Sequence, residues 1–245
     1  MSWDTLLDEL TDFALSLLKL PETERTGQAL FDDQTWFLHT WSRDKMVSSS
    51  GPIPVPAPRN KALHPIGCDI SGAYIQFQFK VGDTIDAEKM PALSQLQVRV
   101  TGDAAYELCV VELEDHWRVD THDFQGSPRE PHPLIHFQRG GHSQDDWAAK
   151  ANYVPGPALP KRPGDDYWQA LLQSPGPRVP FLPLCPILAI DYVIGQHDGD
   201  VWDRLRNAPE YRAIVGHAQE RLWVPFFEGL SNDGLRRLWL GPMLL

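Results

Sequence analysis

Histidine and aspartate side chains gather in one part of the sequence, between His116 and His142. Five of the nine histidines of the chain lie in this stretch, together with Asp120 and Asp123. Neutral imidazoles and a carboxylate are suitable ligands for zinc and other divalent transition metals. The same groups can also move protons in acid–base catalysis without a metal. This stretch therefore holds the first candidate site of the chain.

Strand periodicity selects particular members of this cluster. The sequence around it alternates between apolar and polar residues, which predicts two half-buried strands joined by a turn rich in Gly and Pro. In such a hairpin, His122 lies near His132. Arg118 lies near His136, and Asp120 shares the face of His122. The sequence predicts a site for a divalent transition metal such as zinc, with four ligands: Asp120, His122, His132 and His136.

The same alternation supports a second interpretation, in which these residues are only the solvent-exposed face of a polar hairpin. Val119, Leu134 and Phe137 would then form its buried side. The spacing matches no established metal motif such as H-E-x-x-H on a helix, and a register shift of one residue would scatter the cluster to both faces. Both interpretations stay open on the sequence alone.

Other residues with reactive side chains have a structural explanation as well as a chemical one. Cys185 precedes a predicted helix, where a thiol can become nucleophilic, but its apolar neighbours favour a buried structural thiol. Asp191 lies inside an apolar helix and must be paired with an Arg, a Trp or a backbone amide if buried. His217 and Glu220 are spaced to form a surface pair on a helix. Motifs for nucleotide binding and for a serine nucleophile are absent from the sequence.

Composition limits the partners. The formal charge of −11, from 33 acidic and 22 basic residues, disfavours nucleic acid, because affinity for phosphate depends on clustered Lys and Arg. The three cysteines form no C-x-x-C pair, which is typical of a reducing compartment. The sequence shows no signal peptide and no apolar run of about 20 residues that could cross a membrane. We therefore expect a soluble, cytoplasmic protein without a membrane partner.

The periodicity of the chain predicts an α+β fold, with an antiparallel meander packed between an N-terminal helix and a C-terminal helical segment. The N-terminal helix covers residues 2–19, whereas the aromatic-rich residues 22–46 have no clear assignment. Four strands are expected, over residues 73–81, 96–100, 106–122 and 133–139. Helices are expected over residues 143–151, 165–173, 186–196, 200–207 and 209–230, with Pro225 kinking the last one.

We expect one domain over residues 1–245, because a four-strand sheet needs these helices to bury its apolar face. A subdivision near residues 154–164, between a sheet region and a helical region, is the alternative. Residues 48–60 are rich in Pro and form either a linker or an extended strap across the surface. Ile53 and Val55 interleave with the prolines, which favours the strap.

The order of elements, with His132 and Pro133 at the start of the last strand, is similar to the ubiquitin-conjugating fold. The resemblance covers residues 64–200. It implies a relative without catalytic activity, because His142 and Ser143 stand where that family places its active cysteine shortly after the His-Pro pair. Such a relative would be a binding module.

Three functions are compatible with the sequence. The first is a non-enzymatic interaction protein or accessory subunit of a soluble intracellular assembly, with a protein partner or a second copy of the chain. It is indicated by nine tryptophans and by an apolar C-terminus, Leu235, Leu238, Trp239, Leu240, Met243 and Leu244. The second is a metal-assisted hydrolase or nuclease that uses the four ligands named above. The third is the inactive ubiquitin-conjugating-like binding module.

Overall fold

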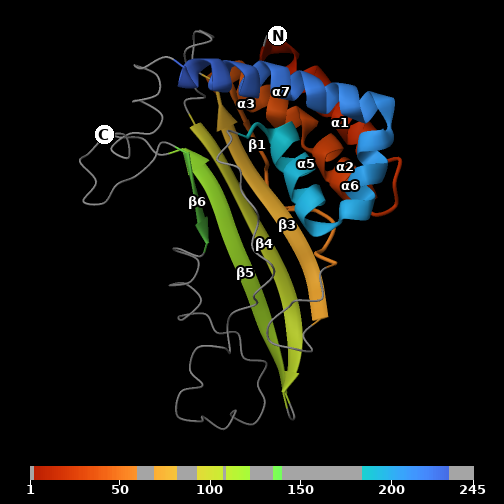
Figure 1. The fold of residues 1–245 in the computed structure, drawn as a ribbon. Helices are drawn as coiled ribbons and strands as arrows, with labels where there is room; N and C mark the ends of the chain where they lie inside the picture. Colours follow the sequence, from red (N-terminus) through yellow and green to blue (C-terminus); the bar gives the residue numbers. More distant parts are fainter. Residues whose placement is uncertain are drawn as a thin grey trace, which may run out of the picture.

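Helices lie against one face of an antiparallel β-sheet in the computed structural model (Figure 1). The structure describes residues 3–59, 69–81, 93–106, 109–121, 135–139 and 184–231. One group of helices precedes the sheet in the chain and another follows it. This segregation of helices from strands is the arrangement of an α+β fold, so the predicted fold class is confirmed.

The helices before the sheet form one half of the covering layer. They are the 3-10 turn η1 (Trp3–Thr5) and the helices α1 (Leu6–Leu17), α2 (Glu24–Asp32) and α3 (Gln34–Asp44). The predicted apolar stripe of α1 is buried, including Leu10 and Phe13. α1 and α2 approach closely at Gly27, where an added Cβ would stand 2.7 Å from the carbonyl oxygen of Ala14. The aromatic-rich segment without an assignment from sequence is thus two helices.

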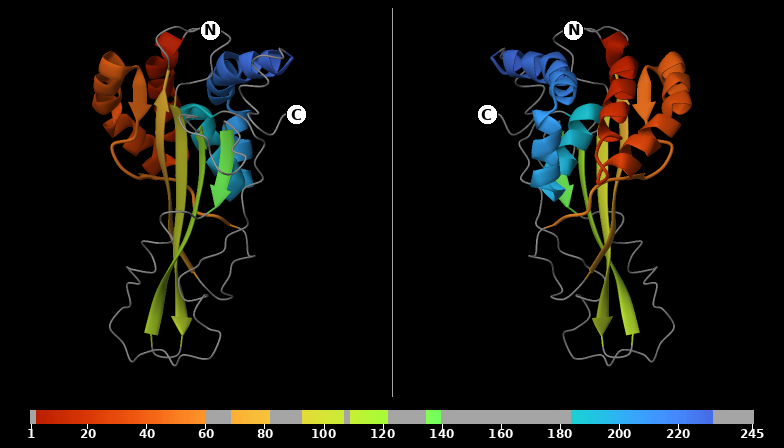
Figure 2. Two further views of the ribbon diagram at one scale, coloured as in Figure 1. Left: turned by 90° about the vertical axis from the view of Figure 1, so that its left-hand side faces the viewer. Right: turned by 90° about the vertical axis from the view of Figure 1, so that its right-hand side faces the viewer.

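The sheet contains the four predicted strands and two short additional ones. The strands are β1 (Met46–Ser48), β2 (Ile53–Pro54), β3 (Asp69–Lys80), β4 (Leu93–Tyr106), β5 (Cys109–Thr121) and β6 (Ile135–Arg139). Their order is β1-β3-β4-β5-β6, and β2 also pairs with β3. All the pairings are antiparallel. β4 and β5 continue beyond the covering helices at one end (Figure 2).

Residues 48–59 lie against the sheet and the helices. Ile53 and Val55 are buried, as their position between prolines suggests. The backbone N–H of Val55 donates to the carbonyl oxygen of Ala73 in β3 at 2.9 Å. From the other side, the hydroxyl of Thr26 in α2 donates to the carbonyl oxygen of Pro54 at 2.7 Å. We refer to residues 52–59 as the strap.

The second half of the covering layer comes from the C-terminal part of the chain. It consists of α5 (Pro186–His197), α6 (Gly199–Asn207) and α7 (Pro209–Leu230). Pro186 and Pro209 stand at the first helical positions, where a missing N–H leaves no hydrogen bond unmade. α7 continues through Pro225. The helices predicted over residues 143–151 and 165–173, and the apolar residues 235–244, lie outside the described residues.

A buried carboxylate joins these three helices. Asp191 of α5 accepts hydrogen bonds from Trp202 Nε1 at 3.1 Å, from Tyr211 Oη at 3.1 Å and from the guanidinium of Arg206. Arg206 also stacks on the ring of Trp202 at 4.7 Å. Burial, together with this carboxylate, raises the pKa of Tyr211 well above its ordinary value. The prediction that Asp191 is paired inside the helical layer is confirmed.

Replacing Asp191 by Asn should lower the free energy of unfolding by about 3 kcal/mol, because Arg206 would lose its carboxylate at a largely buried position. Urea unfolding followed by tryptophan fluorescence measures the change. Asp203→Asn on the exposed face of α6 is the matched control and should change the stability by less than about 0.5 kcal/mol. Equal stability of the two variants would contradict the linking role of Asp191.

Candidate functional site

The face of the sheet opposite the helices is polar. Alternation along each strand sends one set of side chains into the core and the other set to this open face. The buried set includes Phe77 in β3, Val98 in β4 and Trp117 in β5. The open set includes Tyr74, Gln76, Gln78 and Lys80 in β3, Gln95, Gln97, Arg99 and Thr101 in β4, and Glu114, His116, Arg118 and Asp120 in β5.

Four glutamines form a block at the centre of the open face. Gln76 is paired with Gln97, and Gln78 is paired with Gln95 across β3 and β4. Neighbouring strands lie about 4.8 Å apart, and residues two apart on a strand are separated by about 6.8 Å. Each side-chain amide offers two N–H donors and an acceptor oxygen. The block is therefore a regular array of neutral hydrogen-bonding groups.

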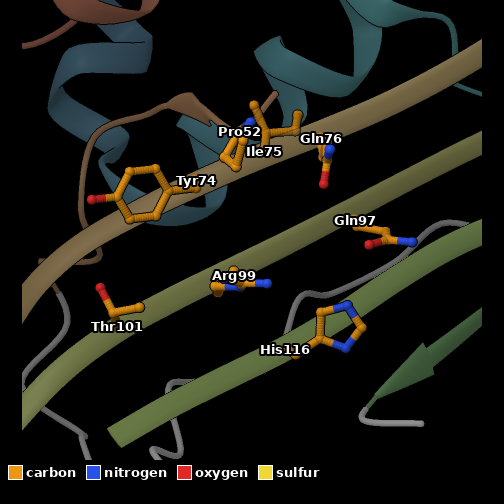
Figure 3. A pocket seen from close by; sticks show the side chains of 8 residues that line it. All are labelled: Pro52, Tyr74, Ile75, Gln76, Gln97, Arg99, Thr101 and His116. Carbon is orange, nitrogen blue, oxygen red and sulfur yellow. The ribbon is translucent and has the colours of Figure 1, made fainter. Parts of the chain in front are cut away.

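A hollow of about 150 Å³ adjoins this block on the side of Arg99 and His116 (Figure 3). Its wall is formed by side chains from three strands and from the strap. The lining residues are Pro52, Tyr74, Ile75, Gln76, Gln97, Arg99, Thr101 and His116. An aromatic ring, two amides, a guanidinium and an imidazole thus surround one small space.

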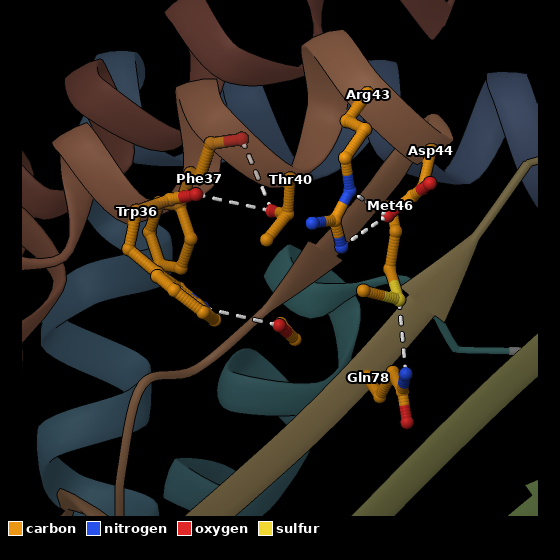
Figure 4. Close-up of polar contacts among 8 residues, drawn as sticks. Trp36, Phe37, Thr40, Arg43, Asp44, Met46 and Gln78 are labelled. Atoms are coloured by element: carbon orange, nitrogen blue, oxygen red, sulfur yellow. Dashed lines mark hydrogen bonds and ion pairs between the residues drawn. The ribbon is translucent and has the colours of Figure 1, made fainter.

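A second hollow, of about 400 Å³, adjoins the block on the side of β1. It is lined by Trp36, Met46, Ser48, Ser49, Gln76, Phe77, Gln78, Gln95 and Gln97. Trp36 is 43 % exposed, and its Nε1 donates to Ser48 Oγ at 3.2 Å (Figure 4). Gln78 Nε2 donates to the sulfur of Met46 at 2.9 Å (Figure 4). We call the four glutamines and the two hollows beside them the glutamine surface.

Two arginines beside the glutamine surface have acidic neighbours. Arg99 Nε lies 3.4 Å from a carboxylate oxygen of Glu114, and Arg118 Nε lies 3.1 Å from one of Asp120. Each of these two arginines therefore has an anionic neighbour on the same face of the sheet. The surface is suited to polar, uncharged groups rather than to phosphates, which need uncompensated cations.

The strap forms a fixed edge of the smaller hollow, because its far end is tied to the helical layer. His197 Nδ1 lies 2.8 Å from the carbonyl oxygen of Pro56. The backbone N–H of Arg59 donates to the carbonyl oxygen of His197 at 3.0 Å. The guanidinium of Arg59 lies 2.6 Å from the carboxylate of Asp198. Burial lowers the pKa of His197 to about 4, so its ring is neutral near pH 7.

The structure places two of the four predicted metal ligands opposite each other. Asp120 in β5 is paired with His136 in β6, and Arg118 is paired with Gln138. This register differs by two residues from the predicted hairpin, in which Arg118 faced His136. A shift of two residues leaves every side chain on its predicted face. Val119 is buried and Phe137 packs against the core, as the polar-hairpin interpretation predicts.

The rest of the predicted cluster cannot be placed. His122 and His132 lie outside the described residues, as do Asp123 and His142. Within the described part of the chain, no group of three or more His, Cys, Asp or Glu residues is arranged to hold a metal ion. The metal-site prediction thus stays a prediction.

Cys185 is a buried thiol at the N-cap position of α5. Burial raises its pKa to about 11, against smaller opposing effects of backbone N–H groups and of Arg221. The structural interpretation of this thiol is therefore confirmed. His217 Nδ1 lies 3.6 Å from a carboxylate oxygen of Glu9 in α1, a partner that sequence spacing did not suggest.

The glutamine block was not among the sites predicted from sequence. Its signal is present as two short repeats, Gln76–Phe77–Gln78 and Gln95–Leu96–Gln97, in which an apolar residue separates two amides. Either repeat alone only indicates a half-buried strand. The site becomes visible once the strand register places the two repeats side by side.

Comparisons with known protein families, with curated proteins and with solved structures found no match to the chain. Among the helices of the described residues, none has the length and apolar character needed to cross a bilayer.

Acid should destabilise the fold through His197. Its pKa is about 4 in the folded protein and near 6.5 in the unfolded chain, so above pH 6.5 the ring is neutral in both states and the stability is at its full value. As the pH falls from 6.5 to 4, the unfolded chain binds a proton that the folded protein does not, and about 3 kcal/mol of stability is lost.

The measurement is urea unfolding of the wild type and of His197→Asn near pH 7 and near pH 4. Asn does not titrate and retains an N–H donor for the carbonyl oxygen of Pro56. The stability of the His197→Asn variant should therefore fall less with acid than that of the wild type. His217→Asn, at a half-exposed position of α7, should keep the acid sensitivity of the wild type. An equal loss of stability in all three proteins would contradict the role of His197.

Proposed function

We propose that the protein is a non-enzymatic interaction module that binds a protein partner through the glutamine surface. The observation that carries this proposal is the block of Gln76, Gln78, Gln95 and Gln97 between two hollows on the open face of the sheet. Amides neither gain nor lose protons near neutral pH, so they serve recognition rather than acid–base chemistry. Concave surfaces with a few fixed polar groups are typical of binding sites.

The location of the strongly shifted ionisable groups supports binding rather than catalysis. Cys185, His197 and Tyr211 have pKa values displaced far from their ordinary range, and burial is the largest cause for each. All three belong to the helical layer. Tyr211 joins helices and His197 holds the strap, so their environments have a structural explanation.

The charge of the chain supports a protein as the partner. The net charge of −11 and the paired arginines beside the glutamine surface disfavour a nucleic acid. A second copy of the same chain would satisfy the same chemistry. The free, buried Cys185 is compatible with the proposed cytoplasmic location, where thiols stay reduced.

Site-specific photo-crosslinking tests the proposal. With p-benzoylphenylalanine at position 97, in cells that naturally express the protein, we expect an adduct with one protein, which mass spectrometry identifies. The same group at Asp12, on the exposed face of α1, should not give this adduct. Adding Gln76→Glu should reduce the adduct at position 97, because a carboxylate removes two N–H donors.

Adducts of equal intensity at both positions, or adducts at position 97 that Gln76→Glu leaves unchanged, would contradict the proposal. An adduct between two copies of the chain identifies the partner as a homo-oligomer.

A metal-assisted hydrolase or nuclease is the second candidate, and one observation favours it. Asp120 and His136 are directly paired across β5 and β6. With His122 and His132 from outside the described residues, they would complete the proposed ligand set. The ion would supply a Lewis acid for hydrolysis.

Zinc titration by calorimetry, on protein purified without a His tag, tests this second candidate. The hypothesis expects one zinc ion per chain and an affinity that Asp120→Asn and His136→Ala each weaken at least about tenfold. His39→Ala on the exposed face of α3 is the control and should bind zinc as the wild type does. Absence of heat and of bound metal would eliminate the candidate.

The resemblance to the ubiquitin-conjugating fold leads to the same kind of function, since it implies a catalytically inactive binding module. Its defining pair, His132 and Pro133, lies outside the described residues. The crosslinking experiment also serves this alternative, because an adduct with ubiquitin or a ubiquitin-like protein would single it out.

A further inference from the structure

We infer that the ligand of the glutamine surface is an uncharged, extended peptide segment of the partner, lying along β3 and β4. This inference rests on the proposed function and specifies what that surface recognises. Three properties of the surface favour such a ligand: the spacing of its amides, its length and its charge.

The spacing of the amides matches the repeat of an extended chain. Gln76 and Gln78 are two residues apart on β3, as are Gln95 and Gln97 on β4, so each pair repeats after about 6.8 Å. Backbone groups of an extended peptide that point to the same side also repeat every two residues. Each amide can donate to a peptide carbonyl and accept from a peptide N–H at once. Successive amides can therefore meet successive peptide groups.

The length of the surface corresponds to a short segment. The larger hollow reaches Gln78 and Gln95, and the smaller one reaches Thr101. Gln95 and Thr101 are six residues apart on one continuous strand, which corresponds to about 20 Å. An extended peptide of about six residues spans that distance.

Each of the two hollows has an aromatic side chain in its wall. Trp36 lines the larger hollow, and Tyr74 with Pro52 lines the smaller one (Figure 3). The indole of Trp36 is half-exposed and fixed by its hydrogen bond to Ser48. Rigid aromatic groups contribute contact area at a small cost in conformational entropy. They suit apolar or Pro side chains of the peptide that enter the two hollows.

The charge of the surface selects a neutral segment. Arg99 and Arg118 already have Glu114 and Asp120 as neighbours on this face. A charged peptide side chain placed over the amides would lose hydration without gaining an unpaired countercharge. The peptide groups themselves and Ser, Thr, Asn or Gln side chains find matched donors and acceptors among the four glutamines.

The experiment uses the full-length protein and random decapeptides displayed on phage. Enriched sequences are synthesised with a fluorescein label, and their affinity is measured by fluorescence anisotropy. We expect enriched peptides to carry no net charge and to lose at least about tenfold in affinity for the double variant Gln76→Glu/Gln97→Glu. These residues face each other, so the variant removes donors and places like charges side by side.

Two further variants keep the experiment interpretable. Gln219→Glu in α7 adds one negative charge on the helical side and should leave peptide affinity unchanged. Gln76→Thr/Gln97→Thr shortens the side chains with a residue favoured in strands, and should also weaken binding. Unfolding midpoints equal to that of the wild type verify that the variants are folded.

Each outcome has a defined meaning. Neutral peptides that bind in a glutamine-dependent way support the inference. Enrichment of charged peptides, or peptide binding that the glutamine substitutions do not affect, overturns it. Failure of all peptides, while crosslinking still finds a partner at position 97, overturns the inference and leaves the proposed function standing. Glutamine-dependent binding of oligosaccharides on a glycan array, with no peptide bound and no protein adduct, overturns both.

Discussion

In the residues that the structure describes, helices cover one face of the sheet, so β3, β4 and β5 each bury every second side chain and turn the others toward the opposite face. This requirement fixes the strand register, because a shift of one residue would bring Val98 to water and Gln97 into the core. The glutamines lie side by side because Phe77 and Leu96, which stand between them along β3 and β4, are buried in the core under the helices. The core and the proposed binding surface are thus two sides of the same strands.

Polar links hold the covering layer together. Asp191 connects α5 to α6 and α7, and Arg221 of α7 pairs with Glu9 of α1 while it stacks on Trp3 at 5.2 Å. His197 extends this scaffold to the strap. The shifted pKa values of Tyr211 and His197 belong to these links, whereas the four glutamines carry no titratable proton.

Periodicity was sufficient to predict the four main strands and the last three helices, because each buries one face or is buried all round. It was insufficient for α2, α3, β1 and β2, which are short and owe their conformation to tertiary contacts such as Thr26 with Pro54. The number of histidines drew attention to the hairpin, but the structure describes only the backbone pairing of Asp120 with His136 from that set, so the metal site stays a prediction. The glutamine block depends on pairing between strands, which no single segment of sequence specifies.

The proposed function requires contact between a protein partner and the open face of the sheet. The most direct measurement is an NMR spectrum of protein labelled with ¹⁵N on the glutamine side chains, alone and with the partner identified by crosslinking. If the partner binds the glutamine surface, the side-chain signals of Gln76, Gln78, Gln95 and Gln97 shift on binding, while the signal of Gln219 does not change. A bound partner that leaves those four signals unchanged would contradict it.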